Sequence, residues 1–123
     1  MRYLTDRKRV EGKGASGTGT ADHWFMQVSA VGLAIIVPVF VFIFGCAFGG
    51  GYEEVIATFS RPLPAIVTAL VLVFGLQHFR KGAQMMIEDY VHGTAGKVTL
   101  IAVILFSYGL MAVGLFALAK IAL

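Results

Sequence analysis

Three long apolar blocks constrain this chain of 123 residues more than any other feature. Residues 28–48 and 98–119 contain no charged side chain. As a helix, the first of these blocks would be about 30 Å long, which matches the hydrocarbon core of a bilayer. With 58% apolar and only 14% charged residues, the chain is too apolar for a soluble domain. We therefore predict an all-α integral membrane protein with three transmembrane helices.

The second apolar block differs from the other two, because it runs into polar residues. Its charge-free part, residues 62–77, is too short to cross a bilayer alone. The helix must therefore continue through His78 to about Tyr90, which brings polar side chains to membrane depth. The three spans are accordingly predicted at about residues 27–48, 62–90 and 97–120.

Proline and hydroxyl residues give local signals within and between these spans. Pro38 lies in the middle of the first span and is expected to kink it. A short loop is expected at about 49–61. Ser60 precedes Pro62, so we predict that it caps the second helix with the proline in the first turn. Thr94 is the predicted cap of the third helix.

The basic residues indicate how the chain is oriented. Residues 1–23 form a polar, basic tail that we expect in the cytoplasm, and residues 24–123 form the membrane anchor. Eight of the ten Lys and Arg residues lie in the tail or in segment 80–97. The positive-inside rule then places the N-terminus inside and the C-terminus outside. Because these residues flank apolar blocks without interleaved aromatic residues, we expect no nucleic-acid partner.

His78 is the first candidate site residue. Ionisable groups inside a span are costly, at about 2.5–3.5 kcal/mol on insertion scales for the charged types, and therefore indicate function. Gly75 and Gly82 share its helix face one turn away on either side, which would leave a groove for a flat porphyrin. The alternative is a histidine hydrogen-bonded to a neighbouring helix. Since His23 and His92 lie near the inner interface, a second histidine ligand would have to come from a partner chain.

Asp89 and Tyr90 form the second candidate site. Asp89 follows His78 by eleven residues, nearly three whole turns, so the two share a face about 16 Å apart. A carboxylate beside a phenol at the interface suits proton donation to a membrane quinone. The alternative is an interfacial acid next to an aromatic-belt tyrosine. Arg80 and Lys81 would pair with haem propionates or with lipid phosphates.

These residues also carry a family resemblance. The pattern of His78, ten further residues and Asp89-Tyr90, continued as DYVHG (89–93), resembles the second span of the small hydrophobic membrane-anchor subunit of succinate dehydrogenase, respiratory complex II. Segment 16–30, SGTG…HWFMQVSA, is similar to the approach to the first span in alphaproteobacterial members. The order and orientation of the three spans also match, so the similarity covers nearly the whole chain.

The resemblance implies a role for each site residue. His78 would be an axial ligand of the iron of haem b, opposite a histidine of the larger cytochrome b-type anchor subunit. Tyr90 would hydrogen-bond a carbonyl of ubiquinone, and Asp89 would support it or relay protons. Electrons would come from succinate through a flavoprotein and an iron–sulfur subunit. The chain carries no flavin or iron–sulfur motif, so it would not be catalytic alone. The resemblance also implies a location in the bacterial inner membrane.

One departure and two other hypotheses remain. Many relatives place an arginine after the equivalent of Gln27, where this chain has Val28; Arg80 is a candidate substitute. We assign no role to His92. The chain would otherwise be a haem-free structural anchor of a respiratory complex, or a small transporter or channel subunit in which His78 and Asp89 relay protons.

Overall fold

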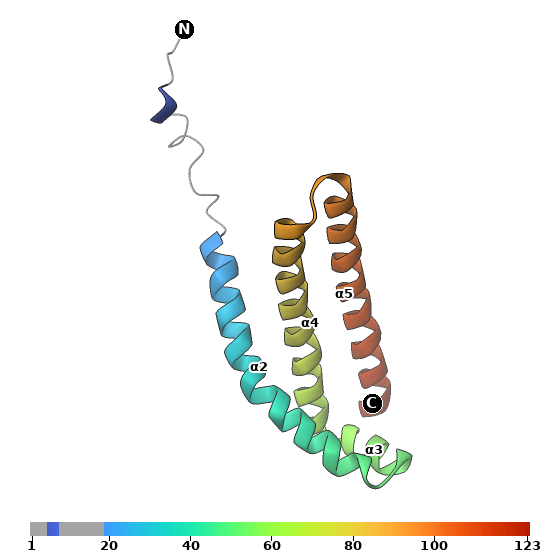
Figure 1. The fold of residues 1–123 in the computed structure, drawn as a ribbon. Coiled ribbons are helices and arrows are strands. Elements are labelled where there is room, and N and C mark those ends of the chain that lie inside the picture. Colours follow the sequence, from blue (N-terminus) through green and yellow to red (C-terminus); the bar gives the residue numbers. More distant parts are fainter. Residues whose placement is uncertain (1–4, 8–18) are drawn as a thin grey trace.

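The computed structural model describes residues 5–7 and 19–123, and within these ranges the protein is helical. Its long elements are α2 (Gly19–Phe48), α4 (Pro62–Tyr90) and α5 (Gly93–Ala122), and a short helix, α3 (Tyr52–Phe59), joins the first two. In the part of the chain described, these three long helices are long and apolar enough to cross a membrane. The predicted all-α fold with three spans is confirmed (Figure 1).

Two of the observed helices, α2 and α5, extend beyond the predicted spans. Helix α4 has the predicted bounds, whereas α2 begins at Gly19 and α5 runs from Gly93 to Ala122. Asp22 lies in the first turn of α2, where a carboxylate interacts favourably with the helix dipole, so the helix continues past the apolar block. The rest of the predicted polar tail, apart from residues 5–7, lies outside the described residues.

Both predicted helix caps are wrong. Ser60 ends α3, where its hydroxyl donates a 2.9 Å hydrogen bond to the carbonyl of Ala57. The residue before a proline favours an extended backbone, so the cap of α4 falls on Arg61, which has φ −79° and ψ 144°. Thr94 lies inside α5, and the N-cap position is occupied by His92, without a side-chain hydrogen bond.

Helix α3 replaces the plain loop expected between the first two spans. Glu53 and Glu54 occupy its first turn, which suits the dipole of a helix N-terminus. Its last residue, Phe59, is buried, with ring centroids 6.4 and 6.2 Å from those of Phe40 and Phe44 in α2. These aromatic contacts hold α3 against α2, at the lower end of the bundle in Figure 1.

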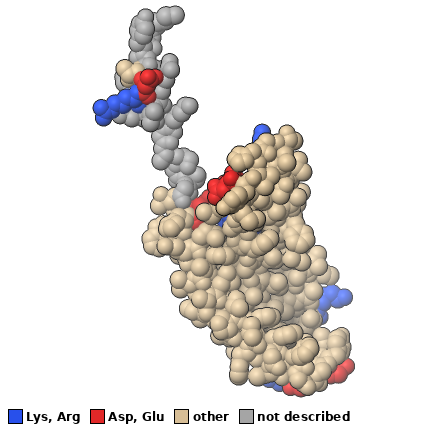
Figure 2. Space-filling view, in the orientation of Figure 1, with Lys and Arg blue, Asp and Glu red and all other residues tan. Residues whose placement is uncertain are grey.

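Helix α4 is the middle helix of the bundle. It packs against α2 on one side and α5 on the other, while the backbones of α2 and α5 do not approach each other closely over the described residues (Figure 1). Pro38 lies inside α2, which curves along its length. The apolar side chains buried within the described chain are few, namely Ala47, Phe59, Ile87 and Leu118. In Figure 2 the charged side chains lie toward the two ends of the bundle, and the face between them is uncharged.

A two-residue turn joins α4 to α5. Gly93 has φ +69°, a left-handed conformation that glycine adopts without strain. A Cβ atom at Gly96 would overlap the carbonyl oxygen of Val91, so the absence of a side chain lets the first turn of α5 close over the end of α4. These glycines hold α4 and α5 as a tight antiparallel hairpin.

Candidate functional site

His78 lies on the side of α4 that faces α2. Its Nδ1 atom is 2.8 Å from the hydroxyl oxygen of Ser29 in α2, and Ser29 is only 2% exposed. The two glycines predicted to leave a groove for a porphyrin face the same helix, whose side chains lie against them. Ideal Cβ atoms at Gly75 and Gly82 would lie 3.9 Å from the side chain of Leu33 and 3.7 Å from that of Met26. One interpretation of His78 was a histidine hydrogen-bonded to a neighbouring helix, and the bond to Ser29 is such a contact.

The same arrangement fits an axial haem ligand. Among the described residues, the imidazole makes its one hydrogen bond through Nδ1, which leaves Nε2 for an external partner. An imidazole nitrogen is a usual ligand of haem iron. No group of three or more His, Cys, Asp or Glu side chains that could hold a metal occurs in the described part of the chain. The described residues thus form no complete metal site around His78.

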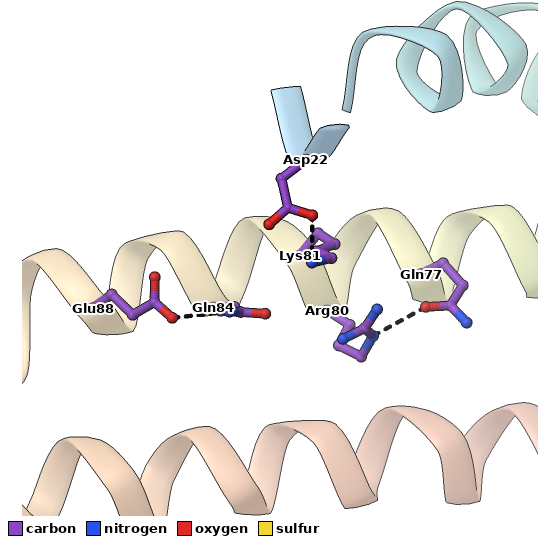
Figure 3. Close-up of polar contacts among 6 residues, drawn as sticks. All are labelled: Asp22, Gln77, Arg80, Lys81, Gln84 and Glu88. Atoms are coloured by element: carbon purple, nitrogen blue, oxygen red, sulfur yellow. Dashed lines mark hydrogen bonds and ion pairs between the residues drawn. The ribbon is translucent and has the colours of Figure 1, made fainter. Parts of the chain in front are cut away.

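An ion pair fixes α2 against α4 close to His78. The ammonium of Lys81 donates a 2.6 Å hydrogen bond to Oδ1 of Asp22, and both side chains are partly exposed (Figure 3). Exposed ion pairs contribute about 0.2–1 kcal/mol. Lys81 comes three residues after His78, so the ion pair and the bond between His78 and Ser29 hold the same two helices together about one turn apart.

Arg80 lies on the other side of α4. Its Nε atom donates a 3.0 Å hydrogen bond to the side chain of Gln77, and its guanidinium lies 5.5 Å from the ring centroid of Tyr108 in α5. Figure 3 shows Arg80 pointing toward α5, whereas Asp22 reaches Lys81 from α2. Two residues along a helix correspond to about 200° of rotation. It is therefore Lys81, and not Arg80, that shares the α2 side with His78.

Asp89 and Tyr90 lie at the end of α4, away from His78. Both are exposed, Tyr90 to 80%, and neither has a hydrogen-bond partner among the described residues. Their neighbours Gln84 and Glu88 are paired with each other through a 2.8 Å hydrogen bond (Figure 3). The structure thus separates the two candidate sites and leaves the phenol and carboxylate of the second free to meet a partner or a substrate.

Val28, where an arginine was expected, lies on the outer face of α2. It is 62% exposed and borders an open apolar groove of about 520 Å³, whose other lining residues are Trp24, Gln27, Ala30 and Val31. Ser29 faces α4, and one residue along a helix corresponds to about 100° of rotation, so the side chain at position 28 lies to one side of that contact. An arginine here would reach outward from the bundle.

Ser29 and Asp22 are the site residues that the sequence analysis missed. A signal existed for Ser29, because a hydroxyl inside an apolar span must find a hydrogen-bond partner. The identity of that partner depends on how α2 is rotated against α4, which the sequence pattern does not define.

Comparisons with known proteins identify the family of this chain. The family model described as the transmembrane subunit of succinate dehydrogenase or fumarate reductase matches residues 1–116. The chain is also 42% identical over 123 residues to the succinate dehydrogenase hydrophobic membrane anchor subunit of Paracoccus denitrificans, covering 100% of this chain and 95% of that protein. No solved structure gives a significant match. The chain therefore belongs to the family of transmembrane subunits of succinate dehydrogenase and fumarate reductase.

Proposed function

We propose that this membrane-anchor subunit also contributes one ligand of haem b and part of a ubiquinone-reduction site. The observation that carries the proposal is the state of His78, a histidine within a membrane-spanning helix whose Nδ1 is hydrogen-bonded and whose Nε2 has no partner among the described residues. Haem b, when bound, supplies a one-electron site inside the membrane. We assign the opposing ligand to a larger cytochrome b-type anchor subunit, because His23 and His92 are exposed at helix starts.

Ubiquinone reduction is assigned to the exposed end of α4. Reduction to ubiquinol takes two electrons and two protons, and we assign the electrons to succinate by way of the flavoprotein and iron–sulfur subunits. The hydroxyl of Tyr90 would donate a hydrogen bond to a quinone carbonyl. This bond stabilises the negative charge that develops on the carbonyl oxygen during reduction. Asp89 would pass protons from the aqueous side. Support comes from the exposure of both groups at the helix end.

The anchoring role is tested by purification of the tagged full chain from its own membranes in a mild detergent. We expect a flavoprotein, an iron–sulfur protein and a second anchor protein to co-purify, with a b-type signal in the reduced-minus-oxidised spectrum. A chain that purifies in full yield without these proteins would contradict the assignment of partners.

A haem-free anchor is the second candidate function. The bond between Ser29 and His78 favours it, since a histidine that only joins two helices would make the same contact. The difference spectrum of the same preparation separates the two candidates, because a complex with all its subunits but without haem b would leave His78 a purely structural role.

The family assignment and the three spanning helices describe a multi-pass protein of the inner membrane. We propose that its N-terminus is cytoplasmic. The start of α2 and the turn between α4 and α5 lie at one end of the bundle, and the C-terminus lies at the other (Figure 1). Eight of the ten basic residues belong to segments connected to the first end.

A phosphatase fused after Leu123 tests this orientation. The enzyme folds only outside the cytoplasm. We therefore expect the fusion after Leu123 to be active and a fusion within the turn at His92 to be inactive. The reverse activities would show that the bundle is inverted.

A further inference from the structure

The hydroxyl of Ser29 takes part in two hydrogen bonds. It donates a 3.2 Å bond to the backbone carbonyl of Met26, one turn earlier in α2, and it lies 2.8 Å from Nδ1 of His78 in α4. Ser29 is 2% exposed, so water does not compete for these positions. The role of one partner, as donor or acceptor, therefore determines the role that is open to the other.

Both contacts of Ser29 can be hydrogen bonds at the same time in only one arrangement of protons. A hydroxyl has one proton, and a backbone carbonyl can only accept. With the proton of Ser29 given to the carbonyl of Met26, the histidine must donate through Nδ1–H to the oxygen of Ser29. A neutral imidazole has one N–H, so Nε2 is then the unprotonated nitrogen with a lone pair. This is the tautomer that binds a metal through Nε2.

We propose that Ser29 is a positioning residue that holds His78 as a haem ligand through Nε2, an inference that rests on the proposed haem site. Histidines that bind metals usually donate their other N–H to a carboxylate, a carbonyl or water, and this bond fixes the tautomer and the ring orientation. Ser29 occupies that place here. The bond to the carbonyl of Met26 in turn fixes the rotamer of the serine.

A serine suits this position better than a carboxylate does. A carboxylate would bind the N–H more strongly, but a charged group at membrane depth is costly to insert. The neutral hydroxyl accepts the bond without adding charge, and its own proton is already satisfied by the helix backbone.

The inference predicts an effect on the electronic state of the haem. A hydrogen bond accepted from Nδ1–H makes the imidazole a stronger donor, which stabilises the ferric more than the ferrous iron. In Ser29→Ala this bond is lost and the ring is free to turn. We expect the haem midpoint potential to rise, the ferric low-spin electron paramagnetic resonance (EPR) signal to shift, and haem affinity to fall by about tenfold.

Ser107→Ala is the matched control. Ser107 is 0% exposed and also donates its hydroxyl to a helix carbonyl, that of Val103 at 2.8 Å, but its hydrogen bonds involve no histidine. Both substitutions remove one buried hydroxyl of the same kind. The measurements use the complete complex, with partner subunits quantified to verify assembly. We expect Ser107→Ala to keep the wild-type potential and EPR signal.

Two further variants separate the hydrogen bond from packing. Ser29→Thr keeps the hydroxyl and is expected to restore the wild-type potential. Ser29→Cys keeps the shape of the side chain but replaces the hydroxyl oxygen with a weak acceptor. It is expected to resemble Ser29→Ala even if the alanine variant assembles poorly. A wild-type potential and EPR signal in Ser29→Ala or Ser29→Cys would overturn the inference, as would a threonine variant that behaves like alanine. Absence of haem b from the wild-type complex would overturn the proposed haem site itself.

Discussion

Replacing His78 with alanine is expected to abolish the native low-spin haem b signal of the assembled complex. The variant lacks the only imidazole that the described part of the chain holds within the bundle at membrane depth, bonded to Ser29. The iron would then keep one axial protein ligand at most, and a change from two ligands to one alters the spin state. The reduced-minus-oxidised spectrum and the ferric EPR signal of the purified complex measure this effect.

His92→Ala is the control for this experiment. His92 is exposed at the start of α5, and its side chain makes no capping hydrogen bond. The same chemical change at this position should leave the haem signals unaltered. A full native signal in His78→Ala, with assembly intact, would remove His78 from the ligand set.

Replacing Tyr90 with phenylalanine is expected to lower ubiquinone reduction by about 100-fold, the lower end of the range for a positioned proton donor. The substitution removes one hydroxyl and keeps the ring, which is 80% exposed at the end of α4 and so adds little to internal packing. Succinate oxidation measured with an artificial dye bypasses the quinone and should be retained. The ratio of the two activities therefore isolates the quinone step.

Tyr52→Phe tests whether any exposed phenol has this effect. Tyr52 is 76% exposed, like Tyr90, but it begins α3 at the opposite end of the bundle (Figure 1). We expect wild-type quinone turnover in this variant. Equal turnover in both tyrosine variants would exclude Tyr90 from the quinone site.

Hydrophobic length predicts the number of spans and the bounds of α4 because a helix in lipid must cross a fixed thickness. It does not predict α3, whose position depends on long-range contacts between Phe59 and two rings of α2. The two caps were missed by one or two residues, since backbone conformation next to Pro62 and Gly93 outweighed the preference of hydroxyl side chains.

The candidate site divides in a similar way. Spacing along one helix correctly separated His78 from the Asp89–Tyr90 pair, because helical geometry alone gives their distance. It did not identify Ser29 as the partner of His78, or the stacking of Arg80 on Tyr108. Those contacts join different helices and depend on how the helices are rotated against one another. Family resemblance supplied the names of the ligands, which no spacing defines.

The tight turn between α4 and α5 has a consequence for biogenesis. Arg80 and Lys81 make α4 a poor substrate for insertion by itself, because each cation costs up to about 2.5–3.5 kcal/mol in transfer. The uncharged segment 98–119 of α5 follows after only a short connection, and the guanidinium of Arg80 lies over the ring of Tyr108 within it. The close contact of Gly96 with Val91 lets the two segments lie back to back across a two-residue turn. We therefore expect α4 and α5 to enter the lipid together as a hairpin, with the more apolar α5 offsetting the cost of inserting the charged end of α4.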